Sequence, residues 1–260
     1  MIADLHNHTP LCNHASGEMS QYIEQAIANN TQYFGFSDHA PMDFDKKYRM
    51  SFEDMKQYET NVLDMKKKYS DKIEILLGYE VDYLKGYMDD RVLNADVDYL
   101  IGSVHFLNKW GFDNPEFIGK YDELNIDDIW EEYFFTITEM AESGHFDIVG
   151  HLDLIKVFNF MPNKNILNIV KPTLQAIKKA DITLEINMAG YRKPVKQPYP
   201  APEILKEAFK LNIPITFGSD AHEPKQVSLY ANEVVKLAKD IGYKECAVFS
   251  KKVRKMIPFS

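Results

Sequence analysis

Short apolar segments alternate with longer amphipathic segments along most of the chain. The apolar segments predict strands at 2–6, 33–37, 73–83, 99–104, 148–150, 182–186 and 213–217. The amphipathic segments between them predict helices that include 18–29, 129–142, 166–179 and 230–241. Regular strand–helix alternation predicts an α/β fold with a parallel sheet. About seven such units in one chain favour a barrel over a doubly wound sheet, and no glycine-rich dinucleotide fingerprint supports the latter.

The length of the chain fits one such barrel. Its 260 residues contain no linker rich in Pro, Gly or Ser, no internal repeat and no low-complexity run, so we expect a single domain over 1–260. The longest loop-like stretch, 108–128, is rich in Trp, Phe, Tyr, Asp and Asn. It could be a lid over a site or an ordinary surface loop.

Charge and cysteine content limit the partners and the compartment. The net charge of −9 disfavours long nucleic acids, although bound cations would still allow a small anionic substrate. Cys12 and Cys246 form no CxxC pair, which fits a reducing cytoplasm. We expect no signal peptide, because no basic region is followed by an apolar one near residue 1, and no membrane span, because no apolar run approaches ~20 residues.

The positions of the histidines indicate a site. Five of the eight lie at or just after the end of a predicted strand: His6, His39, His105, His151 and His222. His8 and His14 follow His6 in the first loop. Parallel barrels build their active sites at the carboxyl ends of the strands, so these seven side chains should converge. His145 lies in a helix-to-strand loop at the opposite end, and we expect it to be outside the site.

Two carboxylates strengthen the prediction of a metal site. Glu80 is a charged residue within an apolar strand, and Asp220 follows another strand. A lone buried carboxylate is costly, and a metal ion would remove that cost. A single histidine is more often a hydrogen-bonded core residue than a ligand, but seven at one face with two carboxylates are typical of a metal centre. Such ligands suit zinc, iron and manganese alike, so the metal stays open.

Eight segments of the chain resemble the polymerase-and-histidinol-phosphatase (PHP) family. The histidine and aspartate motifs match the family as a whole, whereas 102–107 and 187–192 point to its histidinol-phosphatase branch. The matching segments are 4–9 (DLHNHT), 12–17 (CNHASG), 37–41 (SDHAP), 78–83 (GYEVDY), 102–107 (GSVHFL), 150–153 (GHLD), 185–193 (EINMAGYRK) and 218–222 (GSDAH).

The resemblance implies a distorted (β/α)7 TIM-like barrel with three divalent metal ions. The first metal would take His6, His8, Glu80 and Asp220. The second would share Glu80 and add His105 and His151, and the third would take His14, His39 and His222. The implied reaction is hydrolysis of L-histidinol phosphate to L-histidinol and inorganic phosphate in histidine biosynthesis.

Further residues are candidates for catalysis and substrate binding. Asp220 would manage the proton of the leaving alkoxide, although His222 or a metal-bound water could do so instead. Arg192 suits bidentate contact with phosphate, and Lys156 would supply a point charge. A solvated surface cation is the alternative for each. Ser103, in the branch segment, is a third candidate for substrate binding.

Two other functions stay open. One is a PHP phosphoesterase that acts on another phosphate ester or on short oligonucleotides, which the negative charge disfavours. The other is a noncatalytic metal-binding module, which the complete set of ligands disfavours. Nothing in the sequence indicates an oligomeric state.

Overall fold

Seven parallel strands form the centre of the computed structural model, which describes residues 1–259. Their order in the sheet is β1-β2-β3-β4-β7-β8-β9. The sheet therefore follows the order of the chain, as the strand–helix alternation predicts. The strands are β1 (Ala3–Asp4), β2 (Tyr33–His39), β3 (Glu74–Asp82), β4 (Tyr99–Ser103), β7 (Ile148–Val149), β8 (Thr183–Asn187) and β9 (Ile215–Gly218).

Backbone contacts between the first and last strands close the sheet. The amide of Leu5 donates to the carbonyl of Phe217 at 2.8 Å, and that of Asp220 donates to His6 at 2.7 Å. Closure occurs where β1 has only two residues in regular pairing, so the barrel is distorted. The prediction of a distorted TIM-like barrel is confirmed.

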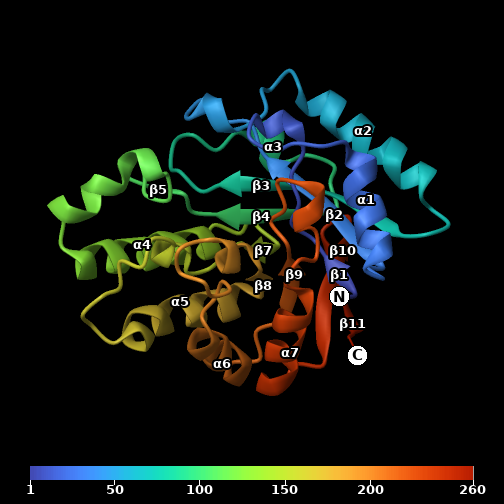
Figure 1. Ribbon diagram of the computed structural model, residues 1–260. Helices are drawn as coiled ribbons and strands as arrows, with labels where there is room; N and C mark the ends of the chain where they lie inside the picture. Colours follow the sequence, from blue (N-terminus) through green and yellow to red (C-terminus); the bar gives the residue numbers. More distant parts are fainter. Residues whose placement is uncertain (260) are drawn as a thin grey trace.

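Helices surround the barrel (Figure 1). Those predicted from the apolar periodicity are present within a few residues of their expected ends. The α-helices are α1 (Met19–Ala28), α2 (Met55–Lys68), α3 (Asp90–Leu93), α4 (Ile126–Glu142), α5 (Ile166–Ala180), α6 (Pro202–Lys210) and α7 (Ala231–Ile241). The 3-10 helices are η1 (Pro10–Cys12), η2 (Lys46–Tyr48), η3 (Pro115–Glu123), η4 (Leu154–Lys156), η5 (Ala189–Arg192) and η6 (Pro224–Gln226).

The barrel interior is packed around Tyr99. Its hydroxyl donates to the carbonyl of Leu5 at 2.6 Å, although 94 residues separate the two. A Cβ on Gly35 would lie 1.9 Å from that hydroxyl oxygen, so this position of β2 accommodates only glycine. The interior is therefore a filled core, and the open space lies at the ends of the strands.

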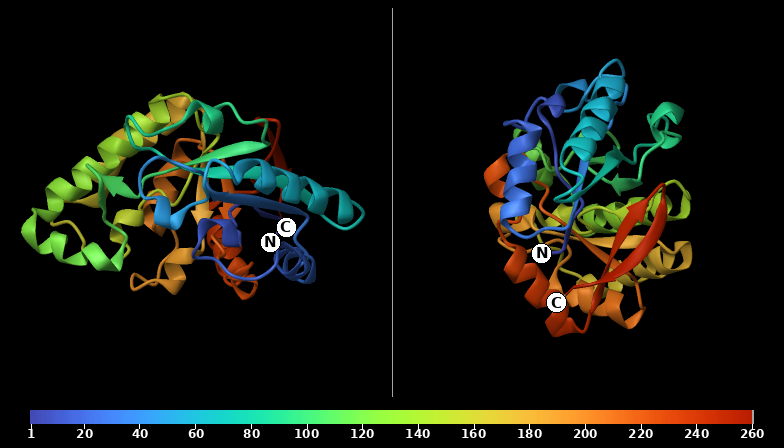
Figure 2. Two further views of the ribbon diagram at one scale, coloured as in Figure 1. Left: turned by 90° about the horizontal axis from the view of Figure 1, so that it is seen from above. Right: turned by 90° about the vertical axis from the view of Figure 1, so that its right-hand side faces the viewer.

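A C-terminal hairpin covers the amino ends of the strands. It consists of β10 (Glu245–Ser250) and β11 (Val253–Pro258), and the right-hand view of Figure 2 shows it across that end. The ring of Phe249 lies 5.9 Å from that of Tyr99, and the Thr216 hydroxyl donates to the carbonyl of Ala247 at 2.9 Å. With this end closed, ligands reach the barrel from the carboxyl ends of the strands.

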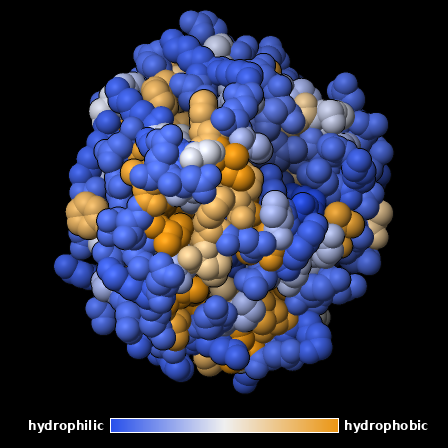
Figure 3. All heavy atoms as spheres, turned by 60° about the vertical axis from the view of Figure 1, so that its left-hand side comes forward, coloured by the Kyte–Doolittle hydropathy of each residue, from blue (hydrophilic) through white to orange (hydrophobic). Residues whose placement is uncertain are grey.

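The stretch 108–128 is structured. The hairpin of β5 (Phe106–Leu107) and β6 (Trp110–Gly111) leads into η3, beside the carboxyl ends of the strands. Figure 3 shows hydrophobic residues at the surface among hydrophilic ones. Phe117, Leu124 and Phe135 are among the exposed large apolar side chains. Within residues 1–259, no helix is both long enough and apolar enough to cross a membrane.

Candidate metal centre

The ends of the strands bring the predicted ligands together. His39 and Glu80 lie in register on neighbouring strands, at the ends of β2 and β3. The chain beyond β4 and β7 carries His105 and His151, and the chain beyond β9 carries Asp220 and His222. The loop after β1 supplies His6, His8 and His14. All nine predicted ligand residues therefore lie at one end of the barrel; their role as ligands stays a prediction.

Glu80 lies at the middle of this cluster. Its carboxylate is almost fully buried, and its two oxygens face five imidazoles from four segments of the chain. The distances from Glu80 are 2.9 Å to His151 Nε2, 3.0 Å to His39 Nδ1, 3.4 Å to His6 Nε2, 3.6 Å to His105 Nε2 and 3.7 Å to His8 Nε2. One carboxylate is thus shared among neighbouring groups of ligands.

Potential ligand atoms form compact groups. Three of the groups whose ligand atoms all lie within 4.8 Å of one another are His6–His8–Glu80, Glu80–His105–His151 and His14–His39–His222. Asp220 adjoins the first group, with Oδ1 3.2 Å from His8 Nε2. The second and third groups have the members of two ligand sets that the family resemblance implies, and the first has those of the remaining set except Asp220, which lies beside it. A fourth group consists of His8, Cys12 and His222.

Unsatisfied nitrogen atoms indicate that cations fit this cluster. Within residues 1–259, His6 Nε2, His8 Nε2 and His39 Nδ1 are buried and make no hydrogen bond of acceptable geometry. His14 Nε2 and His222 Nε2 face each other at 3.0 Å. Buried polar atoms usually have partners, and a metal ion accepts lone pairs from several nitrogens at once. The cluster can therefore hold divalent metals.

The electrostatics of the cluster lead to the same conclusion. Burial alone would raise the pKa of Glu80, but His39, His6 and His105 lower it well below its usual range. Burial lowers the pKa of His39 to about 4, which leaves that imidazole neutral, the form that binds metal. The carboxylates hold the pKa of His6 well above its usual range against the effect of burial. The buried carboxylates thus require positive charge, supplied by protons or by metal ions.

A cavity of about 530 Å³ opens above the cluster, a size that suits a small metabolite. Four histidines, Glu80 and Asp220 line it from the barrel side. The other walls include Asp45, Tyr48, Phe106, Asp113 and Phe117. The stretch 108–128 thus contributes to the cavity wall, and its role as a lid stays a prediction.

Comparison with known proteins places the chain in a family. The family model "PHP domain" matches residues 4–189, well over half of the chain.

The chain belongs to the PHP family.

Relatives with assigned names extend this similarity over nearly the whole chain. The "Probable histidinol-phosphatase" of Deinococcus radiodurans is 36% identical over 246 residues, 93% of this chain and 94% of that protein. The histidinol-phosphatase of Bacillus subtilis is 31% identical over 262 residues, 88% and 96% of the two chains. The crystal structure of histidinol phosphate phosphatase from Lactococcus lactis, complexed with zinc, L-histidinol and phosphate, shares the fold with a TM-score of 0.80 at 21% identity. The match covers 97% of this chain and 98% of that one.

Carboxylates behind the histidine cluster orient its imidazoles. Glu185 Oε1 lies 2.7 Å from His6 Nδ1, and Asp82 Oδ1 lies 2.7 Å from His105 Nδ1. Asp38, which adjoins His39, lies 3.3 Å from His8 Nδ1. Such contacts fix the tautomer and direction of a ligating imidazole. The sequence analysis did not single out Glu185 or Asp82, although each is a charged residue in an apolar strand, the signal that identified Glu80.

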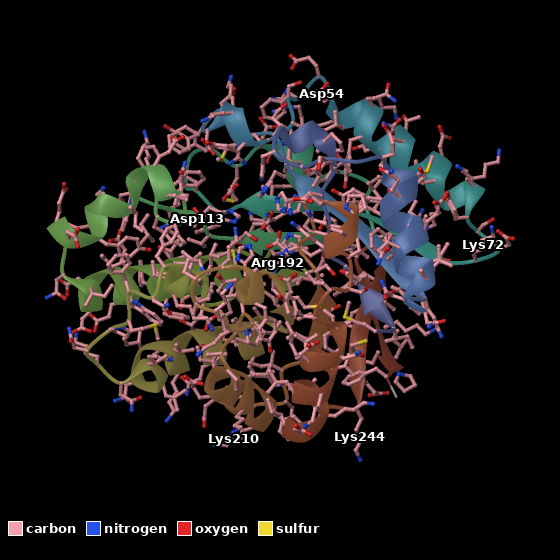
Figure 4. All side chains as sticks on the ribbon, viewed as in Figure 1. Asp54, Lys72, Asp113, Arg192, Lys210 and Lys244 are labelled. Atoms are coloured by element: carbon pink, nitrogen blue, oxygen red, sulfur yellow. The ribbon has the colours of Figure 1, made fainter. Side chains whose placement is uncertain are left out.

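Arg192 lies in the cavity wall beside the histidine cluster (Figure 4). Its Nη2 donates to the carbonyls of Ser219 and Asp220 at 2.9 and 2.7 Å. Its Nη1 is buried and has no hydrogen-bond partner among residues 1–259. These contacts support the backbone at Asp220, whose φ of 49° lies in the left-handed region. They also leave both N–H bonds of Nη1 without a partner within residues 1–259.

The structure does not bring Lys156 to the cavity. The Lys156 ammonium is buried, lies 2.8 Å from the Asp153 carboxylate and donates to the carbonyl of Pro198 at 2.9 Å. With its donors directed away from the metal cluster, Lys156 is poorly placed to bind substrate, contrary to the prediction. Asp153 Oδ2 pairs with Lys156 and accepts a hydrogen bond from the amide of Ala201. Within residues 1–259, Asp153 Oδ1 and His151 Nδ1 make no hydrogen bond.

Ser103 and His145 also lie away from the cavity. Ser103 is fully buried, and its hydroxyl donates to Glu80 Oε1 at 2.7 Å. It therefore orients a predicted ligand, and the prediction that it binds substrate finds no support. His145 is exposed in the loop before β7, at the opposite end of the barrel, as expected.

Proposed function

We propose that this protein hydrolyses L-histidinol phosphate to L-histidinol and inorganic phosphate, the histidinol-phosphatase reaction of histidine biosynthesis. One observation carries the proposal: residues of the metal-binding cluster and Arg192, whose Nη1 has no hydrogen-bond partner within residues 1–259, line the same cavity. A phosphate monoester is a dianion that repels nucleophiles, and several cationic groups at one place offset that charge. The cavity provides such a place.

The choice of substrate rests on named relatives that match this chain over nearly their whole length. The proteins from Deinococcus radiodurans and Bacillus subtilis carry the name histidinol-phosphatase, and each is matched over more than nine-tenths of its own chain. The Lactococcus lactis structure holds L-histidinol and phosphate together with zinc. L-Histidinol phosphate is also small enough for a cavity of about 530 Å³.

We further propose three divalent metal ions, which zinc, iron or manganese could provide. His6, His8, Glu80 and Asp220 would hold the first. Glu80, His105 and His151 would hold the second, and His14, His39 and His222 the third. When bound, such ions lower the pKa of water towards neutrality and offset negative charge on phosphate oxygens.

The side chains of the protein would orient the ester for this chemistry. Arg192 Nη1 would donate to a phosphate oxygen, while Nη2 keeps its bonds to the Ser219 and Asp220 carbonyls. Asp220 and His222 line the cavity, with Asp220 Oδ1 3.5 Å from His222 Nδ1. Asp220 would manage the proton of the leaving alkoxide, a role that His222 or a metal-bound water could take instead. Glu185 and Asp82 would keep the His6 and His105 imidazoles in their binding directions.

Steady-state hydrolysis of a panel of phosphate esters tests the proposal. The panel is L-histidinol phosphate, several sugar phosphates and short oligonucleotides, each with the purified protein and added Mn²⁺ or Zn²⁺. We expect L-histidinol phosphate to have the highest kcat/KM. A higher kcat/KM for a sugar phosphate or an oligonucleotide would refute the assigned substrate, and release of phosphate from none of them would refute the activity.

A further inference from the structure

Five carboxylates line the cavity, and one of them differs from the others. Glu80 and Asp220 face the histidine cluster. Asp82 lies 2.8 Å from Arg49 Nη1 and 2.7 Å from His105 Nδ1, and Asp45 lies 3.5 Å from Arg49 Nη2. For Asp113, the structure shows no ion pair within 4.0 Å and no hydrogen bond to another side chain anywhere in residues 1–259. Asp113 thus lines the cavity without a direct partner for its negative charge among these residues.

The backbone at Asp113 is held on both sides. Phe112, immediately before it, is fully buried and packs edge-on against Tyr133 with ring centroids 5.3 Å apart. Asn114, immediately after it, begins η3, and its side chain accepts a hydrogen bond from the amide of Glu116 at 2.9 Å. With one neighbour in the core and the other capping a helix, the Asp113 side chain has little freedom to leave the cavity wall. Asp113 and Arg192 line the same cavity, and Figure 4 labels both.

The surroundings of Asp113 favour a bound cation. Burial raises the pKa of Asp113 because the attraction of His105 and Lys193 does not offset the loss of water. A carboxylate that is desolvated and unpaired gains more from a cationic partner than an exposed one does. A ligand that carries a cationic group can place that group at Asp113, while its anionic group binds near Arg192 and the metal cluster.

We propose that Asp113 binds the ammonium group of the substrate. It thereby selects phosphate monoesters of amino alcohols over phosphate monoesters whose organic part is neutral or anionic. This inference rests on the proposed histidinol-phosphatase function and adds the residue that recognises the organic part of the substrate. In L-histidinol phosphate the ammonium lies on the carbon next to the one that carries the phosphate ester. A charge-assisted hydrogen bond from the ammonium to Asp113 fixes the substrate at a second point, next to the phosphate.

Comparing three substrates with three proteins tests the proposal. The substrates are L-histidinol phosphate, its deamino analogue (the phosphate ester of imidazolepropanol) and L-phenylalaninol phosphate, which keeps the ammonium but lacks the imidazole. The proteins are the wild type, Asp113→Asn and Asp122→Asn, each loaded with metal. Asp122, exposed on η3, is the matched control because it lies outside the cavity wall.

We expect Asp113→Asn to lower kcat/KM by about ten- to a hundredfold on both ammonium substrates. On the deamino analogue, kcat/KM of Asp113→Asn should stay within about twofold of the wild-type value, because this substrate has no ammonium group to pair with Asp113. Asp113→Glu should recover part of the loss, since it keeps the charge. The control should match the wild type on all three substrates.

Three results would overturn the assignment. An equal loss on all three substrates would mean that Asp113 supports the fold or positions Lys193. A loss confined to the two imidazole substrates would mean that Asp113 binds the ring. No loss at all would leave it without a role in binding. Failure of the wild type to hydrolyse L-histidinol phosphate would instead refute the proposed function, and this inference with it.

Discussion

Glu80 shows how one side chain can organise a whole site. It lies within a buried strand, where a charge is expensive, and its oxygens lie 2.9–3.7 Å from nitrogens of five histidines. The Ser103 hydroxyl donates to the same carboxylate and fixes its direction. The sequence could predict Glu80 because a carboxylate among apolar strand residues needs a compensating charge. It could not predict the distances, which depend on how seven separate strand ends meet.

The first prediction concerns Glu80→Gln. The amide keeps the size of the side chain but removes the negative charge that two metals would share. We expect kcat/KM for L-histidinol phosphate to fall by more than about a hundredfold, because even groups behind metal ligands cost about 10- to 100-fold. Bound metal, measured by elemental analysis, should also decrease. Glu74→Gln, on the exposed start of the same strand, is the control and should change neither quantity. A Glu80→Gln protein with wild-type activity and metal content would refute the bridging role.

The second prediction concerns Arg192→Ala, which removes the unpaired Nη1 together with the bonds to the Ser219 and Asp220 carbonyls. A charged hydrogen bond to phosphate is worth about 1.5–3 kcal/mol, so kcat/KM should fall roughly ten- to a hundredfold. Arg192→Lys should recover only part, because lysine keeps the charge and loses the planar fork.

Metal content separates the two roles of Arg192. Lost activity with unchanged metal would support a contact with phosphate. Lost activity with lost metal would mean that the change disturbs the turn at Asp220, and unaltered kinetics would rule out the contact. Lys210→Ala is the control, because Lys210 is an exposed cation far from the site (Figure 4).

The strands show what can be inferred at the scale of elements. Apolar runs predicted all seven barrel strands, and histidines at their ends predicted where the site would form, because the carboxyl ends of parallel strands share one edge. Pairing between distant side chains is not encoded in such runs. The contacts of Glu185 with His6 and of Asp82 with His105 were therefore missed, and Lys156 was placed near substrate although it pairs with Asp153.

The hairpin β10–β11 was also absent from the sequence analysis. Half of the residues of its second strand are exposed, and its apolar residues do not alternate with polar ones, so the period of two that identifies a half-buried strand is weak there. Its role becomes visible only in three dimensions, where Phe249 packs beside Tyr99 and Phe259 beside Phe217, with ring centroids 5.9 and 5.2 Å apart. The hairpin therefore belongs to the core at the end of the barrel opposite the site.

The third prediction separates stability from activity through this hairpin. Phe249 is buried, and Phe249→Ala should lower the free energy of unfolding by about 3–5 kcal/mol, as deletion of a core aromatic ring does. Urea denaturation measures this loss. At temperatures where the variant stays folded, kcat/KM should match the wild type, since the site lies at the other end. Val253→Ala, on an exposed position of the same hairpin, should change neither. A fall in kcat/KM in folded Phe249→Ala would show that the two ends of the barrel are coupled.

At the scale of the whole molecule, the distribution of charge explains how an acidic protein can bind a dianion. The net charge of −9 would repel phosphate, yet seven imidazoles and Arg192 converge at one end of the barrel. Neutral imidazoles bring no charge of their own. Attraction of the substrate then depends on metal ions, whose charge reverses the local field. Binding, catalysis and part of the stability should therefore all depend on the same ions.

The fourth prediction is that removal of metal abolishes activity and lowers the melting temperature together. Because metals bind the folded chain, each site occupied at 100 times its Kd stabilises the fold by about 2.7 kcal/mol. After dialysis against a strong chelator, we expect no measurable phosphate release and a lower Tm. Zn²⁺, Fe²⁺ or Mn²⁺ should restore both, whereas Ca²⁺ should not, since it prefers oxygen ligands. The Glu80→Gln variant, treated in the same way, should regain little of either. Full activity in a preparation that elemental analysis shows to be free of metal would refute the metal mechanism, whereas recovery of Tm without activity would mean that the ions are structural only.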